Sequence, residues 1–198
     1  MQRSPLLLTS MLACVIAAAA GIGSALLPRH ALVVAAPTFG GPFTMTDTAG
    51  KPVTEADLRG KRTVLYFGFT YCPEVCPTTL FMLTTVMKEM GRSADRLNVV
   101  FVSVDPERDT PEQMKLYLSS FDPRMRGFTG TEAEVATMAK AYHVYYRRVP
   151  IEGGGYTMDH SATVLLLDPE SRLAGTIDYG DEGKIVLAKL IALAGSGT

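Results

Sequence analysis

The chain has 198 residues, a net charge of −1 and a hydrophobic fraction of 47%. This length accommodates one ordinary domain with an appendage, and the charge balance provides no basic surplus for nucleic acid, which we exclude as a partner. Three cysteines are present, and two of them, Cys72 and Cys76, lie close together. An isolated pair does not make a disulfide framework and indicates a redox or metal-binding pair.

The N-terminal residues predict a membrane anchor. Residues 6–27 contain no charged residue, and this length matches a transmembrane helix. We expect the anchor within residues 1–28, followed by a Pro/Gly/Ala linker at 29–41. A cleaved signal peptide is the main alternative, and a lipoprotein would use Cys14. Both the anchor and the signal peptide would place residues 42–198 outside the cytoplasm; we expect a single-pass inner-membrane protein with a periplasmic domain.

The first part of the predicted domain forms a hairpin, a buried strand and a helix. Residues 43–53 carry strand-like residues on both sides of a glycine-containing loop. Residues 63–67 form a nearly continuous apolar run, which is typical of a strand buried on both faces of a parallel or mixed sheet. After the cysteines, apolar residues at helical spacing continue to Met90, and Gly91 ends this predicted helix.

Strands and helices alternate through the middle of the chain. Residues 97–104 predict a second buried strand. The next helix begins with Thr110 as its N-cap and Pro111 as its first residue. A short strand at 127–129 precedes a helix over 131–142, which starts with a capping box.

The last part of the chain predicts an exposed strand, a loop, a hairpin and a helix. Residues 144–149 alternate like an exposed strand, and residues 153–161 follow as a loop with three glycines at its tip. Antiparallel strands at 162–167 and 172–177 precede a helix at 181–193. The order predicts an α/β fold, a thioredoxin-like three-layer α/β/α sandwich with an N-terminal β-hairpin, preceded by one transmembrane helix.

The cysteine pair occupies the junction between a buried strand and a helix. We expect Cys72 in the loop, Cys76 at or near the N-cap and Pro77 near the first helical position, because a proline deeper in a helix clashes with an earlier carbonyl. A helix N-terminus favours anions, which predicts a lowered pKa for Cys76. Disulfide exchange, a structural disulfide and a site for a soft ion such as Cu(I) or Zn(II) all remain open.

A third ligand would distinguish a metal site from a disulfide exchanger. His160 directly precedes a buried strand, and loop residues beside rigid strands are common functional positions, so it is the best candidate ligand. His143 is more simply a packed or surface histidine, and His30 lies in the linker. Met158 is a candidate weak axial ligand, although core packing is its simpler interpretation.

Three blocks of the sequence resemble the signatures of the Sco/SenC family. They are FGFTYCPEVCP at 67–77, VSVDPERDTP at 102–111, and DHSA at 159–162 followed by LDP at 167–169. The resemblance spans essentially the whole predicted domain and implies a membrane-anchored thioredoxin-like protein that binds copper through two cysteines and one histidine. By motif these positions are Cys72, Cys76 and His160. Tyr71 stands where many members have histidine, a departure that should not remove a core ligand.

The resemblance also implies a function and its partners. We expect a copper metallochaperone that serves assembly of the binuclear copper centre of cytochrome c oxidase, with the copper-site subunit as recipient and a copper donor protein as a further candidate partner. Two thiolates and one imidazole suit Cu(I), and Cu(II) would favour a further ligand. Asp159 and Asp105 are candidates for orienting His160. The alternative is a membrane-anchored thiol–disulfide oxidoreductase, in which Cys72 and Cys76 form the redox pair that keeps the partner's copper-site cysteines reduced.

Sequence features at the site favour metal binding over an enzyme. Thioredoxin-like oxidoreductases usually carry a cis-proline before the strand that faces the cysteines, and residues 159–161 contain no proline. Peroxiredoxins place Thr or Ser three residues before the reactive cysteine, where this chain has Phe69 and Pro73. The last hypothesis is an interaction module that docks an acidic partner on exposed arginines. These are Arg124, Arg126, Arg147 and Arg148.

Overall fold

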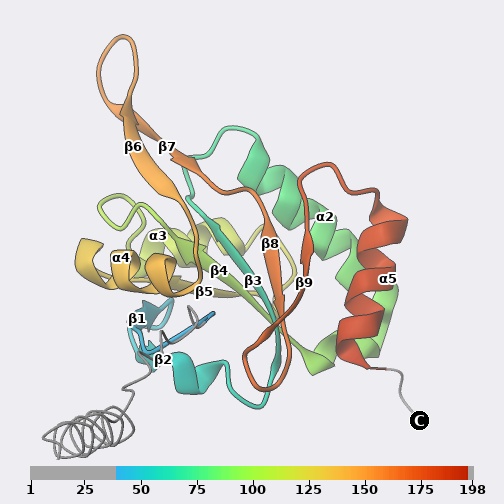
Figure 1. Cartoon of the computed structure of the whole chain (residues 1–198). Helices are drawn as coiled ribbons and strands as arrows, with labels where there is room; N and C mark the ends of the chain where they lie inside the picture. The colour runs from blue at the N-terminus through green and yellow to red at the C-terminus, as the bar shows by residue number, and fades with distance from the viewer. Residues whose placement is uncertain (1–38, 196–198) are drawn as a thin grey trace, which may run out of the picture. The chain divides into compact units, whose positions relative to one another are not determined.

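The computed structural model describes residues 39–195, which all belong to one compact unit. A seven-stranded sheet runs through this unit (Figure 1). Its strands are β1 Thr44–Asp47, β2 Pro52–Thr54, β3 Arg62–Gly68, β4 Leu97–Ser103, β5 Arg126–Thr129, β8 Val164–Leu167 and β9 Leu173–Ile177. Their order across the sheet is β2-β1-β5-β4-β3-β8-β9. The pairs β3–β4 and β4–β5 are parallel, whereas β8 runs antiparallel to both β3 and β9.

Helices cover the sheet on both sides (Figure 1). The helices of the described residues are α2 Val75–Met90, α3 Pro111–Leu118, α4 Glu132–Ala141 and α5 Gly183–Ala194, with 3-10 helices η1 Glu55–Asp57 and η2 Gly91–Arg96. Helix α2 packs against α5, while α3 contacts β5 and α4 contacts β1. This arrangement confirms the predicted mixed α/β, thioredoxin-like sandwich, and β1 and β2 form its predicted N-terminal hairpin.

The central strands are buried on both faces. Every residue of β4 and all but the first residue of β3 are buried, as their continuous apolar sequences predict. Burial of apolar surface contributes about 25 cal/mol per Å². The carboxyl end of β3 therefore has a fixed position, and the loop with the first cysteine of the pair follows it directly.

Two helices begin where their capping residues predict. The hydroxyl of Thr110 accepts a hydrogen bond from a backbone N–H in the first turn of α3, and Pro111 is the first helical residue. Thr131 and Glu134 form the reciprocal capping box of α4. Each cap satisfies N–H groups that a helix leaves without intrahelical partners.

Helix α2 begins two residues earlier than predicted. Its N-cap is Glu74, so Cys76 and Pro77 are its second and third residues rather than its cap and first residue. Pro77 sacrifices no hydrogen bond there, because the first four N–H groups of a helix have no intrahelical acceptor. The residue four positions before it, Pro73, precedes the helix, so the expected clash does not arise. Cys72 lies in the preceding loop as predicted.

A second, two-stranded sheet corrects the predicted loop around His160. Strand β6 (Tyr146–Pro150) pairs antiparallel with β7 (Tyr156–His160), and this hairpin projects from the rest of the fold (Figure 1). Glycines 153–155 all have positive φ, which lets the chain reverse between the two strands. His160 is therefore the last residue of a strand, opposite Tyr146, and not a loop residue.

The predicted anchor at residues 1–28 and most of the predicted linker at 29–41 lie outside the described residues. Cys14 and His30 lie there too. Among residues 39–195, no helix is both long enough and apolar enough to cross a membrane. The boundary at residue 42 stays a prediction.

Candidate metal site

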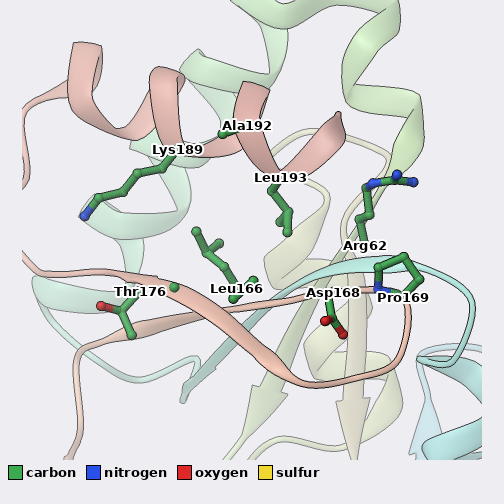
Figure 2. A pocket seen from close by; sticks show the side chains of 10 residues that line it. Arg62, Leu166, Asp168, Pro169, Thr176, Lys189, Ala192 and Leu193 are labelled. Atoms are coloured by element: carbon green, nitrogen blue, oxygen red, sulfur yellow. The ribbon is translucent and has the colours of Figure 1, made fainter. Parts of the chain in front are cut away.

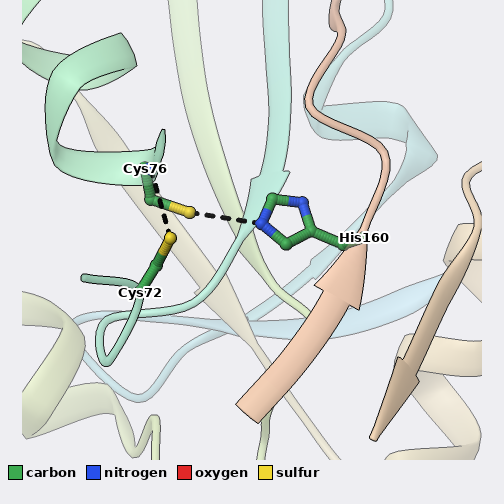
Figure 3. A group of neighbouring side chains, drawn as sticks. All are labelled: Cys72, Cys76 and His160. Atoms are coloured by element: carbon green, nitrogen blue, oxygen red, sulfur yellow. Dashed lines mark hydrogen bonds between the residues drawn. The ribbon is translucent and has the colours of Figure 1, made fainter. Parts of the chain in front are cut away.

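Three side chains from separate segments converge in Figure 3. Cys72 comes from the loop after β3, Cys76 from the first turn of α2 and His160 from the end of β7. Their ligand atoms, two Sγ and one ring nitrogen, all lie within 4.8 Å of one another. The fold thus brings together the three residues that the sequence selects, although Cys76 and His160 are 84 positions apart.

The His160 ring presents its Nε2 atom to the sulfurs. Its Nδ1 lies 2.9 Å from the backbone carbonyl oxygen of Ser161. A carbonyl oxygen can only accept, so Nδ1 carries the proton of the neutral ring. Nε2, which is 3.4 Å from the Cys76 Sγ, therefore holds the free lone pair. A hydrogen bond outside the site selects the tautomer and ring orientation that a metal ligand needs.

Ser161 performs the role that the sequence assigned to Asp105 or Asp159. Asp105 instead accepts hydrogen bonds from Arg108 and from the Tyr156 hydroxyl. Asp159 faces Arg147 across the hairpin, because successive side chains of a strand point to opposite faces. A backbone carbonyl leaves no signal in a sequence, since every residue carries one.

The two cysteines have different surroundings. Cys76 is fully buried, Cys72 is half-buried, and both are free thiols. The backbone N–H of Cys76 donates to the Cys72 Sγ at 3.4 Å (Figure 3). The N–H at the start of α2 therefore points at the loop sulfur and not at the sulfur of its own residue.

Hydrogen bonding and burial separate the pKa values of the two thiols. The pKa of Cys72 falls to about 4, first because the Cys76 thiol donates to its thiolate, with further donation from the backbone of Cys76 and Glu74. The pKa of Cys76 rises, first through the neighbouring Cys72 and then through burial. The predicted lowering of the Cys76 pKa is wrong, because the helix N-terminus acts on Cys72.

Aromatic rings and a glycine enclose the inner side of the site. The rings of Phe69 and Tyr66 contact the His160 imidazole edge-on, with centroids at 5.8 and 6.4 Å. Gly68 lies under Cys76, where an added Cβ would be 2.7 Å from the Sγ. Cys76 is thus closed off from solvent, while the outer side of the site stays open at Cys72.

A buried carboxylate anchors the cysteine loop. Asp109 accepts hydrogen bonds from the Thr70 backbone N–H at 3.0 Å and from the hydroxyls of Thr70 and Ser103, both at 2.6 Å. Burial raises its pKa despite these bonds. The Asp109 carboxylate therefore ties the chain just before Cys72 to the end of β4. The sequence carries no signal for this role, since Asp109 is recognisable there only as the residue before a helix cap.

The other sequence candidates have simpler roles. His143 is exposed and stacks on Phe39 with ring centroids 5.8 Å apart, as a surface histidine. Met158 is buried in the hydrophobic core, as its simpler interpretation, a core-packing residue, predicts. The four arginines of the interaction hypothesis all pair with carboxylates of this chain. The pairs are Arg124 with Asp95 and Asp122, Arg126 with Asp57, Arg147 with Asp159, and Arg148 with Glu107 and Glu132.

A groove of about 640 Å³ lies between α5 and the β8–β9 hairpin (Figure 2). Arg62 and Lys189 contribute cationic groups to its wall, and Leu166 and Leu193 contribute apolar surface. None of the three converging side chains lines it. A metal ion needs ligands that meet at a point rather than a cavity of this size, so we place the candidate site at the sulfurs.

Known sequences similar to this chain belong to one protein family. The sequence profile of the SCO1/SenC family matches residues 34–195. The chain is similar to the mitochondrial protein SCO1 homolog 1 of Arabidopsis thaliana, with 43% identity over 132 residues, covering 66% of this chain and 40% of that protein. The mitochondrial SCO1 homolog of Homo sapiens is 38% identical over 159 residues, covering 79% and 51%. The chain thus spans about half the length of the curated relatives it matches.

Solved structures share the fold. ScoI of Bradyrhizobium japonicum with copper bound is 46% identical, with a TM-score of 0.73 over 79% of this chain and 99% of that one. Yeast Sco1 with copper bound is 35% identical, with a TM-score of 0.74 over 82% and 91%. BsSco, a member of the Sco family of cytochrome c oxidase assembly proteins in which a disulfide switch was identified, is 21% identical and matches in fold, with a TM-score of 0.64 over 81% and 96%.

Proposed function

The chain belongs to the SCO1/SenC family, and we propose that it is a copper metallochaperone that delivers copper to the binuclear copper site of cytochrome c oxidase during its assembly. Cys72, Cys76 and His160 hold the copper. The observation that carries this proposal is the convergence of two sulfurs and an unprotonated imidazole nitrogen within 4.8 Å. The copper-bound relatives support it.

The chemistry of the three ligands favours Cu(I). Two soft thiolates with one imidazole suit Cu(I), whereas Cu(II) favours a tetragonal site with a further ligand. Cys72 is already a thiolate at neutral pH because its pKa is about 4. Cys76 must lose its proton when copper binds, so copper binding releases a proton and strengthens as the pH rises.

The difference in exposure gives a direction for transfer. The half-buried Cys72 is the sulfur that a recipient's thiolate can approach, whereas Cys76 is fully buried. Transfer proceeds by ligand exchange, in which a recipient cysteine joins the copper at the open side, Cys72 leaves first and Cys76 leaves last. The recipient is the copper-site subunit of the oxidase, and a donor protein loads the site by the reverse exchange.

The place of action is also part of the proposal. An anchor within residues 1–28 holds the protein in the inner cell membrane, and the domain from residue 42 onward lies on the periplasmic side. The uncharged stretch at residues 6–27 supports this placement.

The test is an anaerobic titration of the reduced full-length chain with Cu(I) against a chromophoric competitor. We expect one tightly bound ion per wild-type chain, at least about tenfold weaker binding in His160→Ala, and loss of tight binding in Cys72→Ser and Cys76→Ser. His143→Ala is the matched histidine control and should bind as the wild type does. Unchanged binding by His160→Ala would contradict the three-ligand site.

The asymmetry of the thiols favours a second candidate function, a thiol–disulfide reductant. The Cys72 thiolate would attack a partner's disulfide and form a mixed disulfide, which releases one partner thiolate. Cys76 would then lose its proton to that thiolate and attack the Cys72 sulfur, which releases the second partner thiolate and leaves a Cys72–Cys76 disulfide. An external dithiol would restore the reduced protein. This function needs no imidazole ligand, so full disulfide exchange by His160→Ala would favour it.

A further inference from the structure

We propose that Arg108 is the positioning residue that couples the two halves of the site, the loop with Cys72 and the hairpin with His160. Arg108 lies in the turn between β4 and α3 and forms no hydrogen bond or ion pair with Cys72, Cys76 or His160 among the described contacts. The inference rests on the proposed copper site, because it concerns the relative placement of that site's ligands.

On one side, Arg108 holds the start of β7. Its Nη1 donates to the Tyr156 carbonyl oxygen at 3.0 Å, and its guanidinium stacks on the Tyr156 ring at 3.9 Å from the centroid. The Tyr156 hydroxyl donates to one oxygen of Asp105 at 2.8 Å, and the Arg108 Nε donates to the other oxygen. Arg108, Tyr156 and Asp105 are thus each bonded to the other two, and these bonds hold the start of β7 against the turn after β4.

The fastening at Tyr156 reaches His160 through the strand. Tyr156, Met158 and His160 share one face of β7 because side chains alternate along a strand. Met158, between the other two, is buried in the core. The position of Tyr156 therefore sets the position of His160 at the other end of the same strand.

On its other side, Arg108 contacts the cysteine loop. Its guanidinium lies 4.9 Å from the ring centroid of Tyr71, which directly precedes Cys72, and 5.8 Å from that of Phe69. The Phe69 ring in turn contacts the His160 imidazole edge-on. One cation thus touches an aromatic side chain from each half of the site, and cation–π attraction draws both halves toward it.

The properties of Arg108 suit this role. Its side chain is 24% exposed and its partner Asp105 is 1% exposed, so the ion pair is largely shielded from water and salt. A guanidinium can stack through its face and donate through its edge at once, which a lysine ammonium cannot do. Arg148 also stacks on Tyr156, at 4.0 Å, but it belongs to the hairpin and pairs with Glu107 and Glu132.

A double-mutant cycle tests the coupling. The reduced full-length wild type, Arg108→Gln, His160→Ala and the double variant are titrated anaerobically with Cu(I) against a chromophoric competitor. We expect Arg108→Gln to weaken Cu(I) binding about tenfold in the wild-type background and to cause no further loss in the His160→Ala background. An equal loss in both backgrounds, or no loss in the wild type, would overturn the proposal.

A second measurement needs no metal. In the reduced metal-free protein, NMR cross-relaxation between the His160 and Phe69 ring protons reports whether the two halves meet. We expect this signal to disappear in Arg108→Gln and to persist in Arg147→Gln, a control on the same hairpin whose ion-pair partner among residues 39–195 is Asp159 alone. Persistence in Arg108→Gln would overturn the proposal.

A replacement variant and the metal-free measurement cover the cases in which Arg108→Gln does not fold or His160 is not a ligand. If thermal unfolding shows that Arg108→Gln does not fold, Arg108→Lys takes its place with the same expected outcomes, since lysine retains the charge but not the stacking. Equal copper binding by the wild type and His160→Ala would refute the ligand role of His160. The ring contact in the metal-free protein would still decide whether Arg108 positions the hairpin.

Discussion

At the scale of single residues, Cys72 and Cys76 are two identical thiols with opposite pKa shifts. The Cys72 sulfur faces the first N–H groups of α2, and the Cys76 sulfur lies buried against β3. The pair therefore combines a thiolate that persists at neutral pH on the open side with a protonated thiol inside. This division would suit both proposed functions: in copper loading the outer sulfur would meet the ion first, and in disulfide exchange the outer sulfur would attack.

Alkylation of the reduced metal-free protein should show this division. Since the pKa of Cys72 is about 4, its thiolate persists above that pH and is lost as the pH falls through it. We expect the alkylation rate of Cys72 by iodoacetamide to stay nearly constant from about pH 8 to 5, whereas an ordinary thiol, with a pKa near 8.5, slows about tenfold per pH unit below it. Peptide mass mapping checks the rate, and Cys72→Ser should lack the fast reaction. A tenfold decrease per unit between pH 8 and 6 would refute the lowered pKa.

Asp109 is the residue whose loss should most directly loosen the cysteine loop. In Asp109→Ala the Thr70 N–H loses its buried acceptor, so we expect the free energy of unfolding to fall by about 1–3 kcal/mol. Asp109→Asn should be milder, because its amide oxygen can still accept from Thr70 and Ser103. Urea unfolding measures both, with the exposed Asp178→Asn as a control expected to change stability by less than about 0.5 kcal/mol. Equal stability of Asp109→Ala and the wild type would contradict this account.

The raised pKa of Asp109 also makes the free energy of unfolding depend on pH. Between the unfolded pKa, about 3.9, and the raised folded pKa, the folded state binds more protons than the unfolded state. The contribution of Asp109 to stability is therefore greatest below the unfolded pKa and is lost as the pH rises through the folded pKa. Urea unfolding across this range should show that the dependence is absent in Asp109→Asn.

At the scale of elements, the site depends on the close approach of α2 to β3. Gly68 ends β3 directly below Cys76, and a Cβ there would be 2.7 Å from both the Cys76 Sγ and the Phe101 ring. Both neighbours are buried, so neither can move away without disturbing the core. A glycine at this position lets the first turn of the helix lie on the strand.

Gly68→Ala should therefore both destabilise the fold and weaken the site. We expect a loss of about 1–3 kcal/mol in the free energy of unfolding from overpacking, together with weaker Cu(I) binding because the Cys76 sulfur is displaced. Gly183→Ala, at the start of α5 where the added Cβ meets open space, is the matched control and should be neutral. Urea unfolding and copper competition check both variants, and identical behaviour of the two would count against the close approach.

At the scale of the whole molecule, the three proposed ligands connect parts of the fold that are far apart in sequence. Cys72 and Cys76 lie at the junction of β3 and α2, while His160 belongs to a hairpin that projects from the main sheet (Figure 1). An ion held by all three would add a cross-link between the hairpin and the body of the fold. Copper is therefore expected to act on global stability as well as on the site.

Addition of Cu(I) should raise the unfolding temperature of the reduced protein. At a free concentration of about 100 times Kd, binding to the folded state alone contributes about 2.7 kcal/mol. For a domain of this size that corresponds to a rise of roughly 5–10 °C in Tm. Anaerobic calorimetry measures the rise, which should be absent in Cys76→Ser. An unchanged Tm at saturating Cu(I) would show that the ion does not prefer the folded state.

Local features of this protein follow from its residues alone. Continuous apolar runs predicted the buried strands β3 and β4, and capping residues predicted the starts of α3 and α4, because these signals act within a few residues. The same locality misplaced the start of α2 and missed β7, whose alternating residues pair only with a strand beyond a glycine turn. The isolated pair Cys72 and Cys76 and the place of His160 before a buried strand made them candidate ligands, and the motif resemblance implied the three together.

The arrangement and the charge of those residues depend on how the chain packs in three dimensions. The thiolate is at Cys72 and not at Cys76, the His160 ring is oriented by the Ser161 carbonyl, and Asp109 and Arg108 support the two halves of the site. A pKa depends on burial and on the groups that approach in space, and a hydrogen-bond partner depends on which face of a strand a side chain occupies. Both are set when distant segments pack together, so the printed order of residues does not contain them.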